Sequence, residues 1–555
     1  MSRTLRWFAV IGVALVVFGP LGLILYQSFL NEPFFSQSAR FSLDAYRYIL
    51  SDSGFHSAFG TSLVVSFGMT LTSVPLGSLL AFLLVRTDLP GKKWLEPWIL
   101  VPIFLSPVVL AFGYVVAVGP VGFFSLWTKA LIGRVPWSLY SLFGMVLIAG
   151  LTHVPHTFLY VSSALRSLDP SVEEAARVAG AGPWRIAVTV SLPLVLPSIL
   201  FSAALIFLLG FELFGLPLVL GDPAGLLVLT TYLYKLTNLL GIPSYHLMAV
   251  VTLSIVALTF PLVYLQRRML RTAGRFAVIG GKGQAFRPLP LGALRWPAVA
   301  VVVLWLAVTV LLPLVGVALR SLVSSWGEGI KLSEVLTLDH FRELSGYPNL
   351  VRGIINTFLI GGGGGALSVI FYAVVALAAH RWQSRWVTFL DYLVMVPRAL
   401  PGLVVGLAFL WVFLFFKPIA PLRTTLFSLW IAYTVVWLAY GLRLISASLF
   451  QVKPELEEAA RVTGATQGLV FRDVTLPLIR FGLIGSWLLI FMMYIREYST
   501  GVYLLGPGTE VIGSLIVSLW GTGALDLIAD LSVVEVALVG IVLFIALRLG
   551  VRLDA

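Results

Sequence analysis

Four charged residues lie inside or at the edge of long apolar stretches of this chain: Glu212, Arg398, Arg496 and Glu497. A charge at the centre of a membrane helix costs about 2.5–3.5 kcal/mol on insertion scales, so such residues usually face a polar cavity or an oppositely charged partner. The two carboxylates suit a cationic solute, and the two guanidinium groups suit an anionic one. These residues therefore predict either the lining of a solute pathway or ion pairs that hold helices together, and the sequence leaves both open.

Two other groupings could bind a metal or a phosphate, but each lacks a necessary part. His153 and His156 share a helix face, yet two imidazoles alone make a poor metal site. The run from Gly361 to Gly365 has no lysine after it and lies in an apolar segment, where small residues favour close helix packing. The chain has no cysteine and no G-x-x-x-x-G-K-[ST] sequence, so we expect no thiolate chemistry and no ATP hydrolysis by this chain. We assign no catalytic residue and no metal site.

The elements that carry these residues are membrane helices. Hydrophobic residues make up 59% of the 555 positions and charged residues only 11%, which is far too apolar for an ordinary soluble domain. A bilayer core needs about 20 apolar residues per helix. We therefore predict an all-α polytopic membrane protein with about 12 transmembrane helices, near residues 7–30, 58–85, 95–118, 138–162, 190–215, 245–266, 296–319, 353–379, 387–416, 424–446, 477–500 and 531–548.

The positive charges predict the orientation of these helices. With the amino terminus in the cytoplasm, 24 of the 37 Lys and Arg residues fall in cytoplasmic segments and 10 in outside loops. The positive-inside rule favours this arrangement. We therefore expect both termini in the cytoplasm, and we attribute the net charge of +12 to membrane orientation and not to nucleic-acid binding.

One charged segment, called the phrase below, occurs twice in the sequence. Residues 173–194 read EEAARVAGAGPWRIAVTVSLPL, residues 457–478 read EEAARVTGATQGLVFRDVTLPL, and 12 of the 22 positions are identical. Further matches extend the repeat: Ser62 with Thr357 and Val101-Pro102 with Val396-Pro397 at a separation of 295, and Glu212 with Glu497 at 285.

The matches divide the chain into two halves with six helices each in the same orientation, that is, two parallel repeats. We place the first repeat at 1–273 and the second at 296–555. Residues 274–295 form a basic, Gly/Pro-rich cytoplasmic linker between them.

Each copy of the phrase predicts a short helix, a turn and a second short helix. Pro170 and Pro454 precede acidic residues, which the helix dipole favours in a first turn. Gly180 and Gly464 suit the left-handed position that ends a helix. The result is a cytoplasmic elbow whose Ala-Ala patch lets another surface approach closely. Two near-identical copies among divergent helices argue against an ordinary solvated loop.

The pattern Glu-Ala-Ala, a glycine four residues after the second alanine and a later Leu-Pro resembles the EAA motif of the membrane subunits of binding-protein-dependent ABC importers. In that family the loop carries a coupling helix that docks on the cytoplasmic ATPase subunit. The resemblance covers nearly the whole chain and implies a fused permease with the type I ABC importer fold and EAA loops at 163–191 and 448–476. It assigns ATPase coupling to Glu173, Glu174, Ala175, Ala176, Arg177, Gly180, Glu457, Glu458, Ala459, Ala460, Arg461 and Gly464.

The resemblance also implies partners. They are two copies of a cytoplasmic ABC ATPase subunit, which binds MgATP, and a periplasmic or extracellular solute-binding protein. This chain itself would bind no cofactor, and it would lie among the lipids of a bacterial cytoplasmic (inner) membrane.

The cargo is less well defined than the class. The segment REYSTGVYLLGPGTEVIGSLIVSLW is similar to ferric-iron importer permeases, whose relatives carry thiamine, phosphonates, polyamines and other small solutes. Ferric iron is thus one candidate. A secondary transporter driven by an ion gradient is the alternative class, because it also uses repeats and buried charges.

Overall fold

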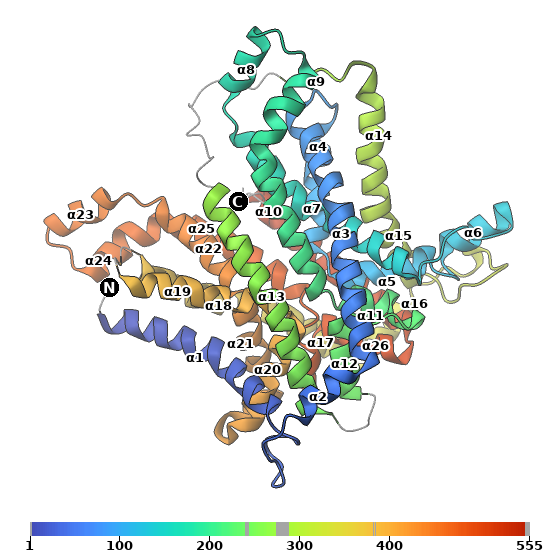
Figure 1. Cartoon of the computed structure of the whole chain (residues 1–555). Helices are drawn as coiled ribbons and strands as arrows, with labels where there is room; N and C mark the ends of the chain where they lie inside the picture. The colour runs from blue at the N-terminus through green and yellow to red at the C-terminus, as the bar shows by residue number, and fades with distance from the viewer. Residues whose placement is uncertain (1–2, 239–242, 274–287, 381, 383, 550–555) are drawn as a thin grey trace.

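The computed structural model describes residues 3–238, 243–273, 288–380, 382 and 384–549 (Figure 1). Within them the chain is helical, and the only strand-like pairings are three isolated β-bridges. The prediction of an all-α membrane protein is confirmed. The expected linker, 274–295, lies outside the described residues up to position 287.

The first half of the chain contains thirteen of the described α-helices. They are α1 Arg3–Ser28, α2 Asp44–Ser51, α3 Ser53–Arg86, α4 Lys92–Phe104, α5 Pro107–Val118, α6 Phe123–Ile132, α7 Leu142–Ser167, α8 Pro170–Val178, α9 Pro183–Ile186, α10 Leu192–Glu212, α11 Gly215–Leu220, α12 Leu229–Asn238 and α13 Tyr245–Ala273. Two shorter helical turns join them, η1 Ala187–Ser191 and η2 Asp222–Ala224.

The second half follows the same order. Its α-helices are α14 Arg295–Leu306, α15 Leu312–Ser321, α16 Asp339–Leu344, α17 Pro348–Leu359, α18 Gly365–Ala379, α19 Arg385–Met395, α20 Gly402–Phe415, α21 Leu426–Val436, α22 Leu438–Phe450, α23 Pro454–Val462, α24 Gln467–Val470, α25 Leu476–Ile495, α26 Ile512–Thr522 and α27 Leu525–Arg548. Its helical turns are η3 Gly292–Leu294, η4 Ala307–Leu311, η5 Leu332–Glu334, η6 Ile360–Gly364, η7 Pro397–Ala399, η8 Lys417–Thr424, η9 Phe471–Thr475 and η10 Val502–Leu504.

Ten helices in the described part of the chain are long and apolar enough to cross a membrane, or up to twelve if each of two bent pairs counts as one span. The bent pairs are Arg385–Ala399 with Gly402–Phe415, at 104°, and Lys417–Thr424 with Leu426–Val436, at 95°. The number of spans therefore agrees with the sequence, but not every expected span is one continuous helix.

Two expected spans break at matching positions. The segment 95–118 divides into α4 and α5 around Ser106, and the segment 387–416 divides around Pro401. Pro107 follows the first break and Pro401 opens the second, and a proline that lacks an amide hydrogen cannot continue the helix before it. A third expected span, 424–446, divides at Trp437 between α21 and α22.

Hydrogen bonds reproduce the sequence repeat at atomic detail. Ser62 on α3 accepts a hydrogen bond from the backbone N–H of Leu229 at 2.9 Å, where α12 begins. Its sequence counterpart Thr357 on α17 accepts one from Ile512 at 2.9 Å, where α26 begins. The same buried hydroxyl thus holds the start of the corresponding helix in each half.

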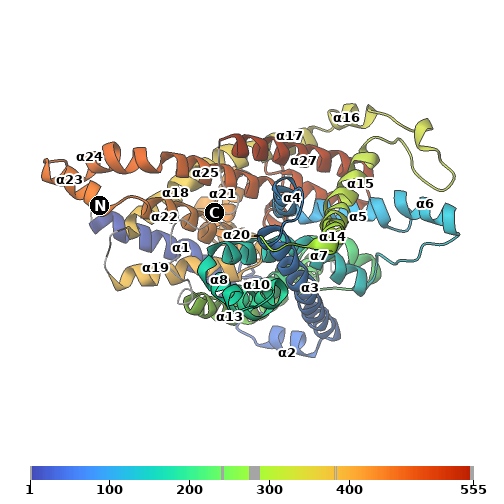
Figure 2. The ribbon, with the colours of Figure 1, turned by 90° about the horizontal axis from the view of Figure 1, so that it is seen from above.

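The two halves interlock through their first helices. Helix α1 packs against α18, α19 and α20 of the second half, and α14 and α15 pack against α4 and α5 of the first (Figures 1 and 2). The first membrane helix of each half therefore packs against the other half.

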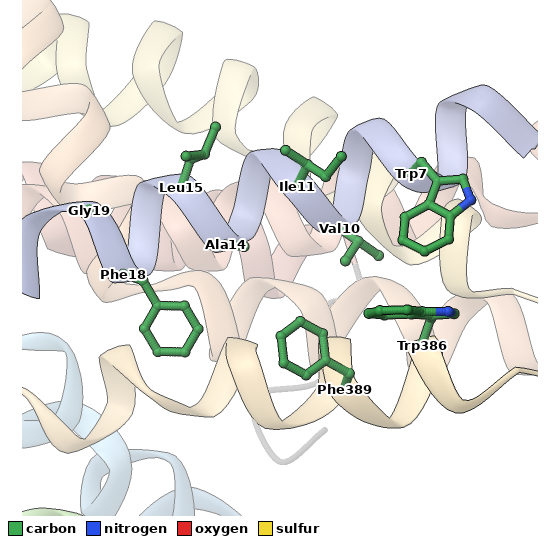
Figure 3. A pocket seen from close by; sticks show the side chains of 9 residues that line it. All are labelled: Trp7, Val10, Ile11, Ala14, Leu15, Phe18, Gly19, Trp386 and Phe389. Carbon is green, nitrogen blue, oxygen red and sulfur yellow. The ribbon is translucent and has the colours of Figure 1, made fainter. Parts of the chain in front are cut away.

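An apolar groove of about 560 Å³ lies along the contact between α1 and α19 (Figure 3). The aromatic side chains of Trp7, Phe18, Trp386 and Phe389 line it, and the Trp7 and Trp386 rings meet edge to face at 4.7 Å. No charged side chain lines this groove, and its lining is almost wholly apolar.

The glycine run Gly361–Gly365 packs closely against α25, as expected. A Cβ atom on Gly362 would come within 3.1 Å of the Phe491 ring. The Gly362 carbonyl accepts a hydrogen bond from the Trp487 indole at 2.9 Å. Small residues here let one helix backbone reach the side chains of the next.

Candidate functional site: two elbows and the seam between the halves

The first elbow has the turn that its glycine predicted. Asp169 accepts a hydrogen bond from the Ser171 N–H at 2.9 Å and caps α8, and this bond lowers the pKa of its carboxyl. Gly180 has a φ of 84°. The Ala181 N–H donates to the Ala176 carbonyl and the Gly180 N–H to the Arg177 carbonyl, both at 3.0 Å. This pair of bonds is a Schellman motif, which requires the left-handed glycine.

The second elbow repeats that geometry. Gly464 has a φ of 90°, and the Ala465 N–H donates to the Ala460 carbonyl at 3.0 Å. In both copies a short helix follows, α9 or α24, and then a π-helical turn, η1 or η9, which leads into a long membrane helix. In Figure 1, α8 lies at the top and α23 at the left, and each projects from its own bundle of helices.

The two adjacent glutamates of the first elbow have opposite environments. Glu173 lies inside, where its Oε1 is 2.9 Å from Arg86 Nη2 at the end of α3 and accepts a hydrogen bond from Ser191 at 2.6 Å. The Arg86 and Glu173 side chains are only 1% and 5% exposed. Glu174 is 57% exposed and pairs with Arg177 one turn later.

The second elbow shows the same division. Glu457 is 8% exposed, and its Oε1 accepts a hydrogen bond from Thr475 at 3.3 Å and lies 3.6 Å from His380 Nε2. Arg461 approaches the other carboxylate oxygen at 4.0 Å. Glu458 is exposed. In both elbows the first glutamate faces the membrane helices and the second faces outward.

The outward surface of each elbow carries small and apolar side chains beside its exposed glutamate. Ala175 and Ala459 are exposed, and Ala176 and Ala460 are half-buried. At the tips, Val178 and Val462 are 88% and 87% exposed. Exposed apolar side chains that recur at equivalent places are typical of a surface that another protein covers.

The base of the first elbow has an additional neighbour. Within the expected linker, the Leu289 N–H donates to the Arg86 carbonyl at 2.8 Å, and the Leu291 N–H donates to the Asp88 carboxylate at 2.9 Å. The chain that leads into the second half is therefore hydrogen-bonded to the end of α3, beside the Arg86–Glu173 pair.

Of the four charged residues expected in the membrane, Glu497 sits in a tight turn directly after α25. Its Oε1 accepts hydrogen bonds from the N–H and the hydroxyl of both Ser499 and Thr500, at 2.9–3.2 Å. It is 8% exposed, and a Cβ on Gly402, where α20 begins, would be 3.2 Å from that oxygen. Its contacts hold the chain reversal together.

Glu212, the sequence counterpart of Glu497, is the last residue of α10. Three residues later the chain meets the other half, because the Gly215 N–H donates to the Tyr498 hydroxyl at 3.0 Å. The Phe214 and Tyr498 rings stack with an interplanar angle of 6°. The breaks after α10 and α25 therefore meet at the seam between the two halves.

Arg398 lines a small cavity at this seam. The cavity has a volume of about 90 Å³ and is formed by α7, α10 and α13 of the first half and by α19, η7 and α22 of the second. Its polar lining residues are Tyr160, Gln266, Arg398, Tyr440 and Arg443. No carboxylate lines it.

Arg496, the C-cap residue of α25, lies within electrostatic range of Glu497, Glu535 and Tyr440. Glu535 on α27 is 1% exposed. The two histidines lie nearby on α7, where their rings stack at 5.3 Å and His153 Nδ1 contacts the Ala149 carbonyl at 2.8 Å. Among the described residues no group of three or more potential metal ligands occurs.

Several residues of these sites were not singled out by the sequence analysis: Arg86, Ser191, His380, Thr475, Arg443 and Glu535. A signal existed for two of them, because Ser191 and Thr475 are hydroxyl residues at the same place in the repeat, each 18 positions after its glutamate. Arg86 also has a counterpart, Arg381, at the separation of 295, but Arg381 lies outside the described residues.

The known proteins to which this chain is similar in sequence include several transport permeases. A probable ABC transporter permease protein, y4fN of Sinorhizobium fredii, is 25% identical over 100% of this chain and 96% of its own length. The ferric transport system permease protein FbpB of Actinobacillus pleuropneumoniae is 24% identical over 80% of this chain and 64% of its own. The molybdenum transport system permease protein ModB of Escherichia coli is 36% identical over 28% of this chain and 66% of its own.

The family of binding-protein-dependent transport system inner membrane components matches twice, over residues 73–272 and 373–553. Each match contains one elbow and the membrane helices that flank it. The chain therefore belongs to this family, as a fused permease that carries the family's domain twice in one polypeptide.

Proposed function

We propose that this chain forms the translocation pathway of an ATP-driven importer and that its two elbows receive the motion of the ATPase. The chain is an ABC importer permease subunit, a multi-pass inner membrane protein whose family relies on a separate ATPase. The observation that carries the proposal is the duplicated elbow, with its exposed alanines and tip valines at equivalent positions. Two equal docking surfaces suit two copies of an ATPase subunit.

The mechanism is alternating access between the two halves. When MgATP closes the ATPase dimer, the elbows move together, and the halves tilt to open toward a solute-binding protein docked outside. Hydrolysis then returns the chain to the inward-open state. The ATP-closed dimer shifts the population because it binds the outward-open state better than the inward-open state.

We place the solute pathway at the seam. Arg398 lines the cavity there, and Glu212, Arg496 and Glu497 lie where the broken ends of α10 and α25 meet. These four residues remain the candidate lining, with ion pairing between the halves as the alternative role. Parts of membrane chains that are not continuous helix are tolerated where they line a cavity or are buried in protein.

Ferric iron, the cargo in the name of FbpB, is one candidate, and molybdenum, named for ModB, is another. The arginines of the seam cavity favour a solute that is negatively charged where it passes, such as an oxyanion or a metal ion in an anionic complex. The solute-binding protein selects the cargo before it reaches this chain.

Affinity purification in mild detergent, with identification of the co-purifying chains, tests the class. We expect an ABC ATPase and a solute-binding protein, and the ligand bound to the latter names the cargo. An ion-gradient-driven transporter predicts the opposite result: no ATPase would co-purify, and uptake into vesicles would follow an ion gradient without added ATP.

A further inference from the structure

We propose that Glu173, with Arg86 and Ser191, is a buried tie that fastens the first coupling helix to the membrane helices, and that Glu457 and Thr475 do the same in the second half. The inference rests on the proposed function, and it names the atoms through which movement of the ATPase would reach the membrane helices. Glu173 and Glu457 are then positioning residues, while Glu174 and Glu458 remain on the surface that the partner meets.

Burial in the two coupling helices carries the inference. All residues of α8 are described, and Glu173 is its only buried residue. The same holds for α23, where the only buried residue is Glu457. A short helix that packs on a protein normally buries an apolar stripe. Here the buried contact of each helix is instead a carboxylate.

The contacts of Glu173 join three elements at one oxygen. Oε1 meets Arg86 at the end of α3 and the Ser191 hydroxyl in η1, directly before α10. An apolar contact is non-directional and can slide, whereas the hydrogen bond from the Ser191 hydroxyl to this carboxylate fixes distance and direction, and the buried ion pair with Arg86 resists separation. Movement of α8 would therefore pull on α3 and α10 together.

Helix α10 continues from this tie to the seam. It runs 21 residues from Leu192 to Glu212, which is about 31 Å at the standard helical rise. Close to its far end lies the Gly215–Tyr498 hydrogen bond between the halves. A rigid helix thus connects the tie below the elbow with the place where the halves meet.

The absence of cysteine from the sequence allows a direct test. Spin labels at Val178→Cys, on the elbow tip, and at Leu71→Cys, on the exposed face of α3, report how firmly the elbow is held. We expect one narrow distance distribution in the otherwise unchanged chain and a broader one in Glu173→Gln or Arg86→Gln. The exchanged pair, Glu173→Arg with Arg86→Glu, should narrow it again.

The second readout is the amount of solute transported per ATP hydrolysed by the complex in vesicles. We expect Glu173→Gln to retain its ATPase subunits but to lower this ratio by about 5-fold or more, the lower range of a typical coupling free energy. A helix that was merely misfolded would lose the ATPase itself. Glu328→Gln, which removes an exposed ion pair with Lys129, is the control and should change neither readout.

If Glu173→Gln and Arg86→Gln both kept a narrow distance distribution and an unchanged ratio of solute transported to ATP hydrolysed, the proposed tie would be wrong. If the single variants failed to insert, Ser191→Ala would take their place, and an unchanged ratio there would count equally against it. If the unsubstituted complex showed no ATP-driven transport, the proposed function would be wrong. The distance measurement on this chain alone would still test whether Glu173 holds the coupling helix.

Discussion

The first elbow is fastened through Arg86, whose side chain is 1% exposed, and the described partners of the second are His380, at 11% exposure, Thr475 and Arg461. The backbone of the two elbows is nevertheless the same, with a left-handed glycine at φ 84° in one and 90° in the other. In the first elbow, the Arg86 carbonyl at the end of α3 also accepts a hydrogen bond from the Leu289 N–H. The duplication has therefore preserved the shape that a partner meets and the inward carboxylate, while the described contacts of that carboxylate differ between the copies.

The largest difference is expected from removing the cationic partner. Arg86→Met leaves Glu173 buried without its guanidinium, and breaking a buried pair in this way costs about 3–5 kcal/mol. His380→Leu should cost less, because it removes only one of the described contacts of Glu457 and leaves those with Thr475 and Arg461. Hydrogen exchange measures both: amides of α8 should exchange about 100-fold faster or more in Arg86→Met, and those of α23 should change little in His380→Leu. Equal effects in the two elbows would remove the distinction between them.

The glycines should show no difference between the elbows. Nothing lies within 4 Å of a Cβ placed on Gly180 or Gly464, so the penalty of Gly180→Val or Gly464→Val is conformational, about 1–2 kcal/mol. We expect each variant to insert and to meet its binding protein, but to dock the ATPase weakly and to show little stimulated hydrolysis in vesicles. Gly182→Ala, at a position with open space and no positive φ, should have a much smaller effect. If both valine variants kept wild-type ATP hydrolysis and uptake, the elbows would be ordinary connecting loops that do not couple to the ATPase.

The paired acidic residues at the seam offer a second comparison between the halves. We expect Glu212→Gln and Glu497→Gln each to reduce transport while assembly with the ATPase stays intact. Glu497→Gln should also lower thermal stability, since the carboxylate holds its own turn through four hydrogen bonds. Uptake by the double variant, compared with its yield of assembled complex, is the measurement. Normal uptake would remove both residues from the pathway.

The smallest expected effect concerns the start of each coupling helix. Asp169→Ala should destabilise α8 slightly because it removes a side-chain N-cap, whereas Lys453→Ala should leave α23 unchanged because Lys453 makes no capping bond. Since the hydrogen bond from Ser171 lowers the pKa of Asp169, its contribution is present at neutral pH and is lost as the pH falls through that lowered pKa. On acidification, the helix content of α8 should fall before that of α23. A simultaneous loss in both helices would argue against a role for the Asp169 cap.

Periodicity and repetition predicted the helices well because an apolar run of about 20 residues in a membrane has few alternatives to a helix. Positive φ at Gly180 and Gly464 was predictable for a similar local reason: a left-handed residue that ends a helix favours glycine. The break at Ser106 was not foreseen, although the Pro107 that follows it was in plain view. Proline is tolerated inside membrane helices, as Pro75 and Pro155 show, so its presence does not locate a break.

The burial of Glu173 could not be predicted, because it depends on Arg86, which lies 87 positions earlier (173 minus 86). Adjacent glutamates look alike in a sequence, and only the packing of α8 on α3 and η1 distinguishes the inner from the outer one. Glu535 escaped notice for a related reason. Its helix also carries Asp526, Asp530 and Arg548, and Glu535 has no acidic counterpart in the first half, where Val250 occupies the place 285 positions earlier (535 minus 250).

The distance between the elbow tips tests the account most directly. Spin labels at Val178→Cys and Val462→Cys, the only cysteines in the chain, would be measured by double electron–electron resonance in the complex with the co-purified ATPase. If the elbows receive the ATPase motion, the distance shortens when MgATP is trapped in the ATPase dimer and lengthens after hydrolysis. A distance that stays the same in both nucleotide states, while ATP-driven uptake proceeds, would contradict the account.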